Sequence, residues 1–342
     1  MLNSLAARAA LIGLLSLRQI GAGPHVTPVT DASANVPIQA LWQEPSDLER
    51  LDVFAGPGDV AAPPADATFE FQSLKTSGFS PGYDVKDASG QVWSVKLGPE
   101  AQTEVVASRL LWALGYHQPS VYYVPRWDLQ GGPMPGPQGG GRFRPKGRGL
   151  ETDGNWAWQR NPFVGTQPYR GLIVLMLLLN STDLSNENNV VYKFQTPEDQ
   201  KVRLFVVKDL GATFGETGVY RPRRNYLEGF EREPFLVKDV NGRVKFGYLG
   251  LHRELLKQVT AADVRWICGL LDRLSRDQLR DAFRAGGYSQ DVTERYVAAL
   301  DARVHSGMAL PDTFDGADSD FWVHRQLRKG DGLVHRISGL FH

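Results

Sequence analysis

A strongly apolar stretch that ends in a polar cluster constrains this chain most. Residues 169–179 predict a buried helix, and the cluster Asn180-Ser-Thr-Asp183-Leu-Ser-Asn-Glu-Asn188 begins where they end. The chain must leave the core here and present short polar side chains on a loop, where water and backbone amides can satisfy them. We therefore expect this loop to carry function.

Two β-rich runs follow the polar loop. Residues 190–194 and 203–207 flank the turn-forming sequence at 196–200, which predicts a β-hairpin. Such a hairpin would carry Asp209 back beside Asn188. Their carboxylate and amide oxygens are hard ligands suited to Mg²⁺ or Mn²⁺, while Asp183 would be free to orient a nucleophile. The order of these groups predicts a metal and phosphate site.

This arrangement resembles the catalytic half of protein-kinase-like folds. There the catalytic-loop Asp has an Asn five residues later, and the metal-binding Asp opens an Asp-Phe-Gly motif. Asp183, Asn188 and the sequence Asp209-Leu-Gly211 stand in these places. The resemblance implies that Asn188 and Asp209 bind Mg²⁺ or Mn²⁺ and that Asp183 orients or deprotonates an acceptor hydroxyl.

Two departures bring the pattern closer to atypical members of this superfamily: HipA-like, phosphatidylinositol-kinase-like, CotH-type and secretory-pathway kinases. Ser181-Thr182 stand where ordinary protein kinases have His-Arg, and Ser185 replaces their Lys. The missing Lys leaves the transferred phosphate short of one cation. The side chains that we expect to supply it are Lys193, Lys208 or Arg170.

The upstream sequence predicts three antiparallel strands, at residues 69–71, 83–87 and 91–97. The loop between the first two contains Gly78 and lies where a phosphate-covering loop would donate backbone N–H groups. It lacks a full G-x-G-x-x-G motif, so it is a weak signal alone.

Lys96 ends the third strand, and Glu104 follows on a predicted helix at 101–114. A strand Lys is usually a solvated edge residue, and a Glu near a helix start usually favours the helix dipole. Ser94-Val-Lys96 resembles the Ala-Ile-Lys of kinase strand three, which implies an ion pair that holds Lys96 against the α- and β-phosphates of ATP. Lys96→Met is expected to abolish nucleotide turnover with little loss of fold.

Residues 120–125 predict a further strand that runs into a connector. It resembles the kinase hinge, with Tyr123 and Val124 contacting adenine, and Val85 resembles the apolar cover of the base. Sheet core is the alternative for all three residues.

Residues 131–149 are rich in Gly and Pro and contain Arg142, Arg144, Lys146 and Arg148. This composition predicts a flexible basic loop between lobes, either a solvated linker, which we favour, or a binder of acidic or phosphorylated substrates.

The Arg-rich segment 212–233 lies where an activation segment or substrate shelf would be. Helical spacing from residue 260 onward, with Ser275 and Ser289 as N-caps, predicts a structural helical region.

Composition excludes some classes of protein. Of 342 residues, 38 are Lys or Arg and 38 are Asp or Glu, so no single-sign charge argues for nucleic-acid binding. The single Cys268 forbids an intramolecular disulfide and is expected to be a buried thiol. An apolar stretch at 9–17 is too short to span a bilayer but has the shape of a secretory signal, which would make the protein periplasmic or secreted; the alternative is cytoplasmic.

We therefore predict an α+β, two-lobed protein-kinase-like fold. Its parts are a signal peptide at 1–23, a linker or extension at 24–64 of which 37–54 packs on the domain, a β-rich N-lobe at 65–127, an insert and interlobe connection at 128–165, a mainly helical C-lobe at 166–310 and a tail at 311–342. The predicted activity is phosphoryl transfer from ATP to an unknown acceptor, a protein, lipid, sugar or small molecule, by a monomer. The alternatives are a pseudokinase-like nucleotide-binding module and a kinase-fold enzyme that transfers AMP or another group.

Overall fold

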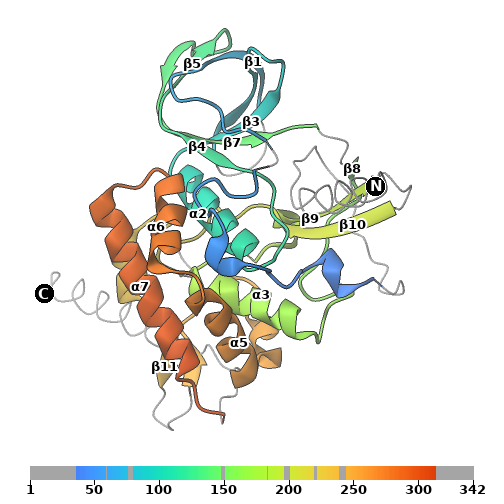
Figure 1. Ribbon diagram of the computed structural model, residues 1–342, viewed down its shortest axis with the longest axis vertical. Helices are drawn as coiled ribbons and strands as arrows, with labels where there is room; N and C mark the ends of the chain where they lie inside the picture. The colour runs from blue at the N-terminus through green and yellow to red at the C-terminus, as the bar shows by residue number, and fades with distance from the viewer. Residues whose placement is uncertain are drawn as a thin grey trace, which may run out of the picture.

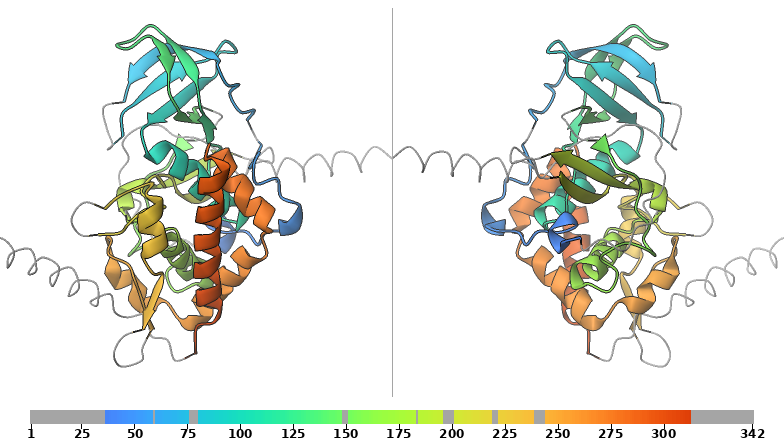
Figure 2. Two further views of the ribbon diagram at one scale, coloured as in Figure 1. Left: turned by 90° about the vertical axis from the view of Figure 1, so that its left-hand side faces the viewer. Right: turned by 90° about the vertical axis from the view of Figure 1, so that its right-hand side faces the viewer.

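The computed structural model describes residues 36–58, 60–75, 80–147, 151–182, 184–195, 201–218, 222–238 and 244–312. These residues form a β-rich lobe and a larger, mainly helical lobe (Figures 1 and 2). The fold is thus α+β with two lobes, as the sequence predicts. The predicted signal peptide at 1–23 and the residues of the tail after 312 lie outside the described residues.

The β-rich lobe is one curled sheet of seven strands, in the order β4-β7-β3-β2-β1-β5-β6. All neighbours pair antiparallel except β1 and β5, which are parallel. The strands are β1 Thr68–Leu74, β2 Gly82–Lys86, β3 Val92–Leu97, β4 Tyr122–Val124, β5 Trp127–Gln130, β6 Gly136–Gln138 and β7 Gly141–Pro145.

Alternation along the strands gives this sheet an apolar face and a polar face. On β2 and β3, Val85 and Val95 are fully buried in the core inside the curl, where aromatic rings from neighbouring strands pack edge to face. Gly82 pairs with Lys96 in the cross-strand register, so these two residues lie on the opposite face. The candidate site forms on that face.

The Gly/Pro-rich stretch does not form the predicted flexible loop. Residues 136–138 and 141–145 are strands β6 and β7, and β7 is an interior strand between β4 and β3 with every residue buried. Glycine within a strand can mark close packing rather than a loop: a Cβ at Gly141 would lie only 3.1 Å from Val95 and 3.4 Å from Leu97.

A single helix, α2 at Glu100–Ala113, lies at the junction of the lobes. Nearly all its residues are buried, because it packs against the sheet on one side and against α6 on the other. The second lobe contains α3 Gln167–Leu178, α4 Leu227–Arg232, α5 Ala261–Asp272, α6 Arg276–Ala285 and α7 Gln290–Met308. Among the described helices, none has both the length and the apolar character that crossing a bilayer requires.

Short elements complete the fold. The strands of the second lobe are β8 Glu151–Thr152, β9 Asn189–Gln195 and β10 Lys201–Val207 in one sheet, and β11 Leu236–Lys238 with β12 Val244–Phe246 in another. The 3-10 turns are η1 Ile38–Ala40, η2 Leu48–Arg50, η3 Asn186–Asn188 and η4 Arg253–Gln258.

The extension before the sheet packs on the helical lobe, as predicted. Leu41, Leu48 and Val53 are buried in its core, and the Trp42 ring lies edge-on to Trp266. This segment is therefore part of the domain.

The predicted helix caps are present in part. The Ser275 hydroxyl accepts a hydrogen bond from the backbone amide of Gln278, and the Gln278 side chain accepts one from the backbone amide of Ser275. Ser289 occupies the N-cap position of α7 but makes no side-chain capping bond.

Candidate functional site

The polar loop leaves the core directly after α3, as predicted. Asn180 has a left-handed backbone (φ 50°), which ends the helix, and Ser181 and Thr182 are buried. Asp183, the predicted catalytic residue, and Gly78, the predicted phosphate-loop residue, lie outside the described residues.

The hairpin β9–β10 returns the chain beside the loop, as the sequence predicts. The Asn188 carbonyl accepts hydrogen bonds from the amides of Lys208, at 2.8 Å, and Asp209, at 3.3 Å. The two predicted metal-binding residues are therefore neighbours.

Lys96 lies at the centre of the candidate site. Its Nζ is 2.8 Å from Glu104 Oε2, 2.8 Å from Asp209 Oδ1 and 3.3 Å from Glu100 Oε2. The predicted ion pair with Glu104 is formed, and both partners are buried, with 8% and 1% of their surface exposed. Strand β3, helix α2 and the residues after β10 thus meet at one ammonium group.

The first turn of α2 packs directly against the Asp209-Leu-Gly211 motif. Thr103 Oγ1 donates to the Gly211 carbonyl at 2.8 Å, and the Gly211 amide donates to Asp209 Oδ1 at 3.2 Å. A Cβ at position 211 would lie 2.7 Å from the Glu100 Cβ, so this contact requires glycine. The motif therefore fixes the position of Asp209 relative to α2.

Two buried arginines that the sequence analysis assigned to a loop belong to the site. Arg142 and Arg144 on β7 are the cross-strand partners of Lys96 and Ser94. Arg142 Nε lies 2.9 Å from Glu104 Oε1, and Arg144 forms an ion pair with the same oxygen. The Arg-x-Arg spacing, which places both side chains on one face of a strand, was the signal that could have identified them.

Glu100 is a third residue of the site that the sequence did not reveal. It accepts a hydrogen bond from Ser80 Oγ at 2.7 Å and forms an ion pair with Arg224, in the Arg-rich segment after Asp209. Glu100 and Glu104 are four residues apart, so both face the sheet from one side of α2. The segment predicted as an activation segment or substrate shelf is thereby connected to the ionic cluster around Lys96. This cluster consists of Lys96, Glu100, Glu104, Asp209, Arg142 and Arg144.

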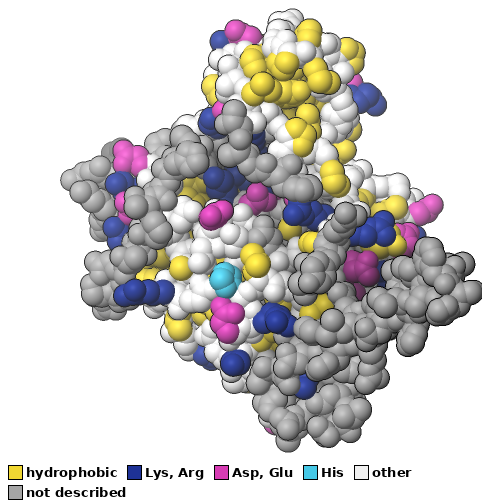
Figure 3. Space-filling model, turned by 180° about the vertical axis from the view of Figure 1, so that it is seen from behind, with side chains coloured by type: hydrophobic (Ala, Val, Ile, Leu, Met, Phe, Trp, Pro, Cys, Tyr) yellow, Lys and Arg dark blue, Asp and Glu magenta, His cyan; other side chains and the backbone are white. Residues whose placement is uncertain are grey.

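Two further lysines lie at the same cluster. The Lys75 side chain lies over Gly82, where a Cβ would be 2.9 Å from the Lys75 Cδ, and Lys208 immediately precedes Asp209. Neither ammonium has a hydrogen-bond or ion-pair partner among the described residues. Figure 3 shows basic and acidic side chains gathered below the β-rich lobe.

The electrostatics of the cluster favour charged carboxylates. Burial alone would raise the pKa of Glu104, but Arg142, Lys96 and Arg144 lower it below its ordinary value. Burial likewise opposes ionisation of Asp209, but Lys96 lowers the pKa of this carboxyl well below its usual range. The pKa of Lys96 is raised, because Glu104 and Asp209 outweigh its desolvation.

The two unpaired lysines are perturbed in the opposite direction. Burial, together with the positive charges of Arg142 and Arg144, lowers the pKa of Lys75 to about 6. Burial and Arg144 lower the pKa of Lys208 to about 8. The cluster therefore holds more cations than its carboxylates neutralise.

The structure does not bring the predicted adenine contacts to this cluster. Val85 lies in the apolar core, on the face of the sheet opposite to the Lys96 side chain. It is therefore a residue of the sheet core, which was the alternative expectation. Tyr123 packs against Gly140 and Gly287, and Val124 is buried in the sheet core.

Strand β4 is not the strand that leads out of the β-rich lobe. Among the strands that the structure describes, it lies at one end of the sheet and pairs only with β7. The chain returns into the sheet through β5 and β6 before leaving from β7. The chain therefore does not leave the β-rich lobe at Tyr123 and Val124, because the next stretch, predicted as an insert, forms strands of the same sheet. Adenine contact by these two residues stays a prediction.

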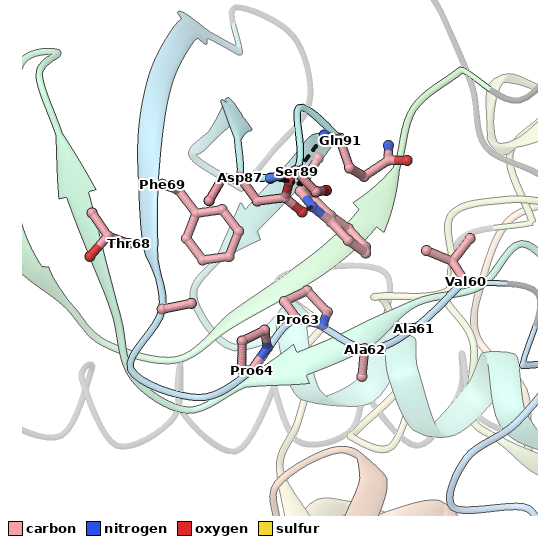
Figure 4. A pocket seen from close by; sticks show the side chains of 13 residues that line it. Val60, Ala61, Ala62, Pro63, Pro64, Thr68, Phe69, Asp87, Ser89 and Gln91 are labelled. Atoms are coloured by element: carbon pink, nitrogen blue, oxygen red, sulfur yellow. Dashed lines mark hydrogen bonds between the residues drawn. The ribbon is translucent and has the colours of Figure 1, made fainter.

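A separate pocket of about 520 Å³ lies on the side of the sheet opposite to Lys96. Val60–Pro64 line one side of it, and the Phe69 ring and the turn from Asp87 to Gln91 line the other (Figure 4). Asp87 accepts hydrogen bonds from Ser89, Gln91 and Trp93, which rigidify the turn.

A divalent metal would find two oxygen-bearing side chains here. Asp209 is 43% exposed at its side chain, and its Oδ2 has no hydrogen-bond partner among the described residues. Asn188 lies beside it. Within the described residues no group of three His, Cys, Asp or Glu side chains could hold a metal, so phosphate oxygens and water would have to complete the coordination.

Taken together, the described residues define a two-lobed α+β protein with a Lys-Glu-Asp cluster where the lobes meet. No protein-family model matches the chain, and no curated protein matches it. Among solved structures, the chain is similar to the Helicobacter pylori proinflammatory kinase CtkA, with a TM-score of 0.43 and 11% sequence identity over 71% of this chain and 96% of that one. A likeness at this level identifies no family.

Proposed function

We propose that this protein is an ATP- and metal-dependent phosphotransferase of the kinase-like type. The observation that supports it most is the meeting of Lys96 with Glu104 from the next helix and with Asp209 from the far side of the hairpin, each at 2.8 Å. A buried ion pair of this kind would hold an ammonium against the α- and β-phosphates.

Each group has one part in the proposed reaction. Asn188 and Asp209 would bind Mg²⁺ or Mn²⁺ with the phosphate oxygens, and the metal would neutralise charge on the transferred group. Asp183 would orient the acceptor hydroxyl or take its proton. Because phosphoryl transfer has a loose transition state, positioning and charge neutralisation supply most of the rate.

Ser185 stands where ordinary kinases have the catalytic-loop lysine, and Lys208 is the best candidate for the cation that replaces this lysine. Lys193 pairs with Glu151 and Asp153, at 3.6 and 3.4 Å, and Arg170 Nε lies 2.7 Å from Asp263. Lys208 has no such partner among the described residues and is adjacent to Asp209. We therefore assign to Lys208 the neutralisation of the transferred phosphate.

The test is incubation of the purified protein with ATP and Mn²⁺, labelled at either the α- or the γ-phosphate. Label transfer from the γ-position, with a mass increase of one phosphate on a product, supports the proposal, and Asp209→Ala should abolish it. Asp277→Ala is the matched control, because its carboxylate is 86% exposed on α6. Transfer of the α-label would instead indicate AMP transfer.

A nucleotide-binding module without turnover is the second candidate, favoured by Ser185 in place of the catalytic-loop Lys. It predicts that ATP raises the melting temperature while neither label is transferred. Absence of both thermal stabilisation and transfer would contradict both functions.

A further inference from the structure

The side chain of Lys75, at the end of β1, lies on the same face of the sheet as Lys96 and has no role in the proposed reaction. This lysine is the residue directly after β1, and its amide donates to the Gly82 carbonyl at 3.0 Å. Its side chain crosses Gly82, the cross-strand partner of Lys96, and so lies on the polar face of the sheet. Glycine at position 82 is required, because a Cβ there would also lie 2.2 Å from the Val95 carbonyl oxygen.

The carboxylates that act on the Lys75 amine are engaged by other cations. Two carboxylates act electrostatically on Lys75, Glu104 and Asp84. Glu104 is shared by Lys96, Arg142 and Arg144, and Asp84 is paired with Lys146 at 2.6 Å. Within the described residues, no carboxylate is left for Lys75. A protonated, partly buried amine beside two buried guanidinium groups is costly unless an anion binds there.

We propose that Lys75 is a phosphate-binding residue, which contacts the polyphosphate of the nucleotide from the β1 side of the site opposite to Asp209. The inference rests on the proposed function and extends it by naming a specificity residue for the number of phosphates. A bound polyphosphate would supply the negative charge that the cluster lacks, and it would be held by a charge-assisted hydrogen bond from the Lys75 amine. AMP, with a single phosphate, would leave Lys75 without this contact.

The low pKa of Lys75 agrees with this role. Burial and the two arginines keep the amine largely neutral without ligand, and an adjacent phosphate would favour its protonation. Without a bound anion, the Lys75 amine therefore adds little positive charge to the cluster.

The test compares dissociation constants for ATP, AMP and inorganic tripolyphosphate in the wild type, Lys75→Met and Lys75→Arg. Lys75→Met is expected to weaken ATP and tripolyphosphate binding by about 10- to 100-fold, with AMP binding changed little. Lys75→Arg should restore most of the loss. Lys86→Met is the matched control, because Lys86 is on the neighbouring strand β2 and pairs with Glu70 at 2.7 Å.

The outcomes separate this inference from the proposed function. If the wild type binds ATP and Lys75→Met binds it equally well, the role of Lys75 is refuted and the phosphotransferase stands. If the wild type and Lys75→Arg bind tripolyphosphate but not ATP, the anion site stands and the kinase-like function falls. Equal weakening of AMP and ATP by Lys75→Met would show a general structural effect and would overturn the inference.

Discussion

The Lys96 ammonium lies 2.8 Å from the Asp209 carboxylate, although 113 positions separate the two residues. The contact joins the third strand of the β-rich lobe to the segment that follows the hairpin of the helical lobe. Because Glu100 and Glu104 reach the same ammonium, the two lobes share one ionic cluster.

Lys96→Met is expected to destabilise the fold as well as to abolish turnover, which revises the expectation from sequence that the fold would be little affected. The substitution leaves buried Glu104 and Glu100 with one cation fewer, and breaking a buried ion pair costs about 3–5 kcal/mol. Urea unfolding should therefore show a clearly lower midpoint than the wild type. Lys86→Met, which removes an exposed partner of Glu70, should leave the midpoint nearly unchanged.

An unchanged midpoint for Lys96→Met would mean that the cluster contributes little to stability. If the midpoint falls as expected, turnover is better tested with Asp209 variants, since the Asp209 side chain is 43% exposed and its removal disturbs the core less.

Gly211→Ala should weaken both stability and turnover. The added Cβ would lie 2.7 Å from the Glu100 Cβ, which forces α2 away from the Asp209 segment, and such overpacking costs about 1–3 kcal/mol. Gly269→Ala is the control, since a Cβ at this position of α5 meets nothing within 4 Å and alanine favours a helix. Circular-dichroism melting of both variants checks the prediction, and equal melting temperatures would contradict the packing argument.

Local sequence patterns predicted most of the helices and strands. The apolar run before Asn180, the hairpin before Asp209 and the strand that ends at Lys96 were all recognisable, because each element is set by its own periodicity. The meeting of Lys96, Glu104 and Asp209 was expected from the resemblance of their order to kinase-like sequences.

The strand β7 could not be recognised in the same way. Its sequence Gly-Arg-Phe-Arg-Pro is atypical of a central strand, because two charged side chains and a proline are expected at an exposed position. Arg142 and Arg144 are buried only because Glu104 and backbone carbonyls receive their N–H groups, and these partners lie far away in the sequence. That compensation is tertiary, so composition predicted a loop.

Cys268 is expected to react with a thiol reagent only after unfolding. Its side chain is fully buried on α5, and burial raises the pKa of the thiol to about 12, so the reactive thiolate is scarce at neutral pH. Labelling with a chromogenic disulfide should be slow in buffer and fast in denaturant. Fast labelling of the native protein would indicate that α5 opens readily.

A buried polar network beneath the polar loop makes stability depend on pH. Asn180 Nδ2 donates to the Gly215 carbonyl at 2.8 Å, and Arg303 donates to Asn180 Oδ1 at 2.6 Å. Glu233 accepts the Thr217 amide at 2.6 Å and the Thr217 hydroxyl. The network therefore connects the start of the polar loop with the segment after Asp209.

Glu233→Gln should remove part of the pH dependence of unfolding. Burial raises the pKa of Glu233 to about 7, against the effect of its bonds from Thr217, so the folded protein binds the proton more tightly than the unfolded chain, where the pKa is near 4.5. This contribution is present below pH 4.5 and is lost as the pH rises towards 7, by up to about 1.4 kcal/mol per unit. In urea unfolding at pH 4.5, 6 and 7.5, the difference in unfolding free energy between wild type and variant should shift in favour of the variant as the pH rises. A constant difference would show that Glu233 ionises in the folded protein as it does in the unfolded chain, and that the network holds a charged carboxylate.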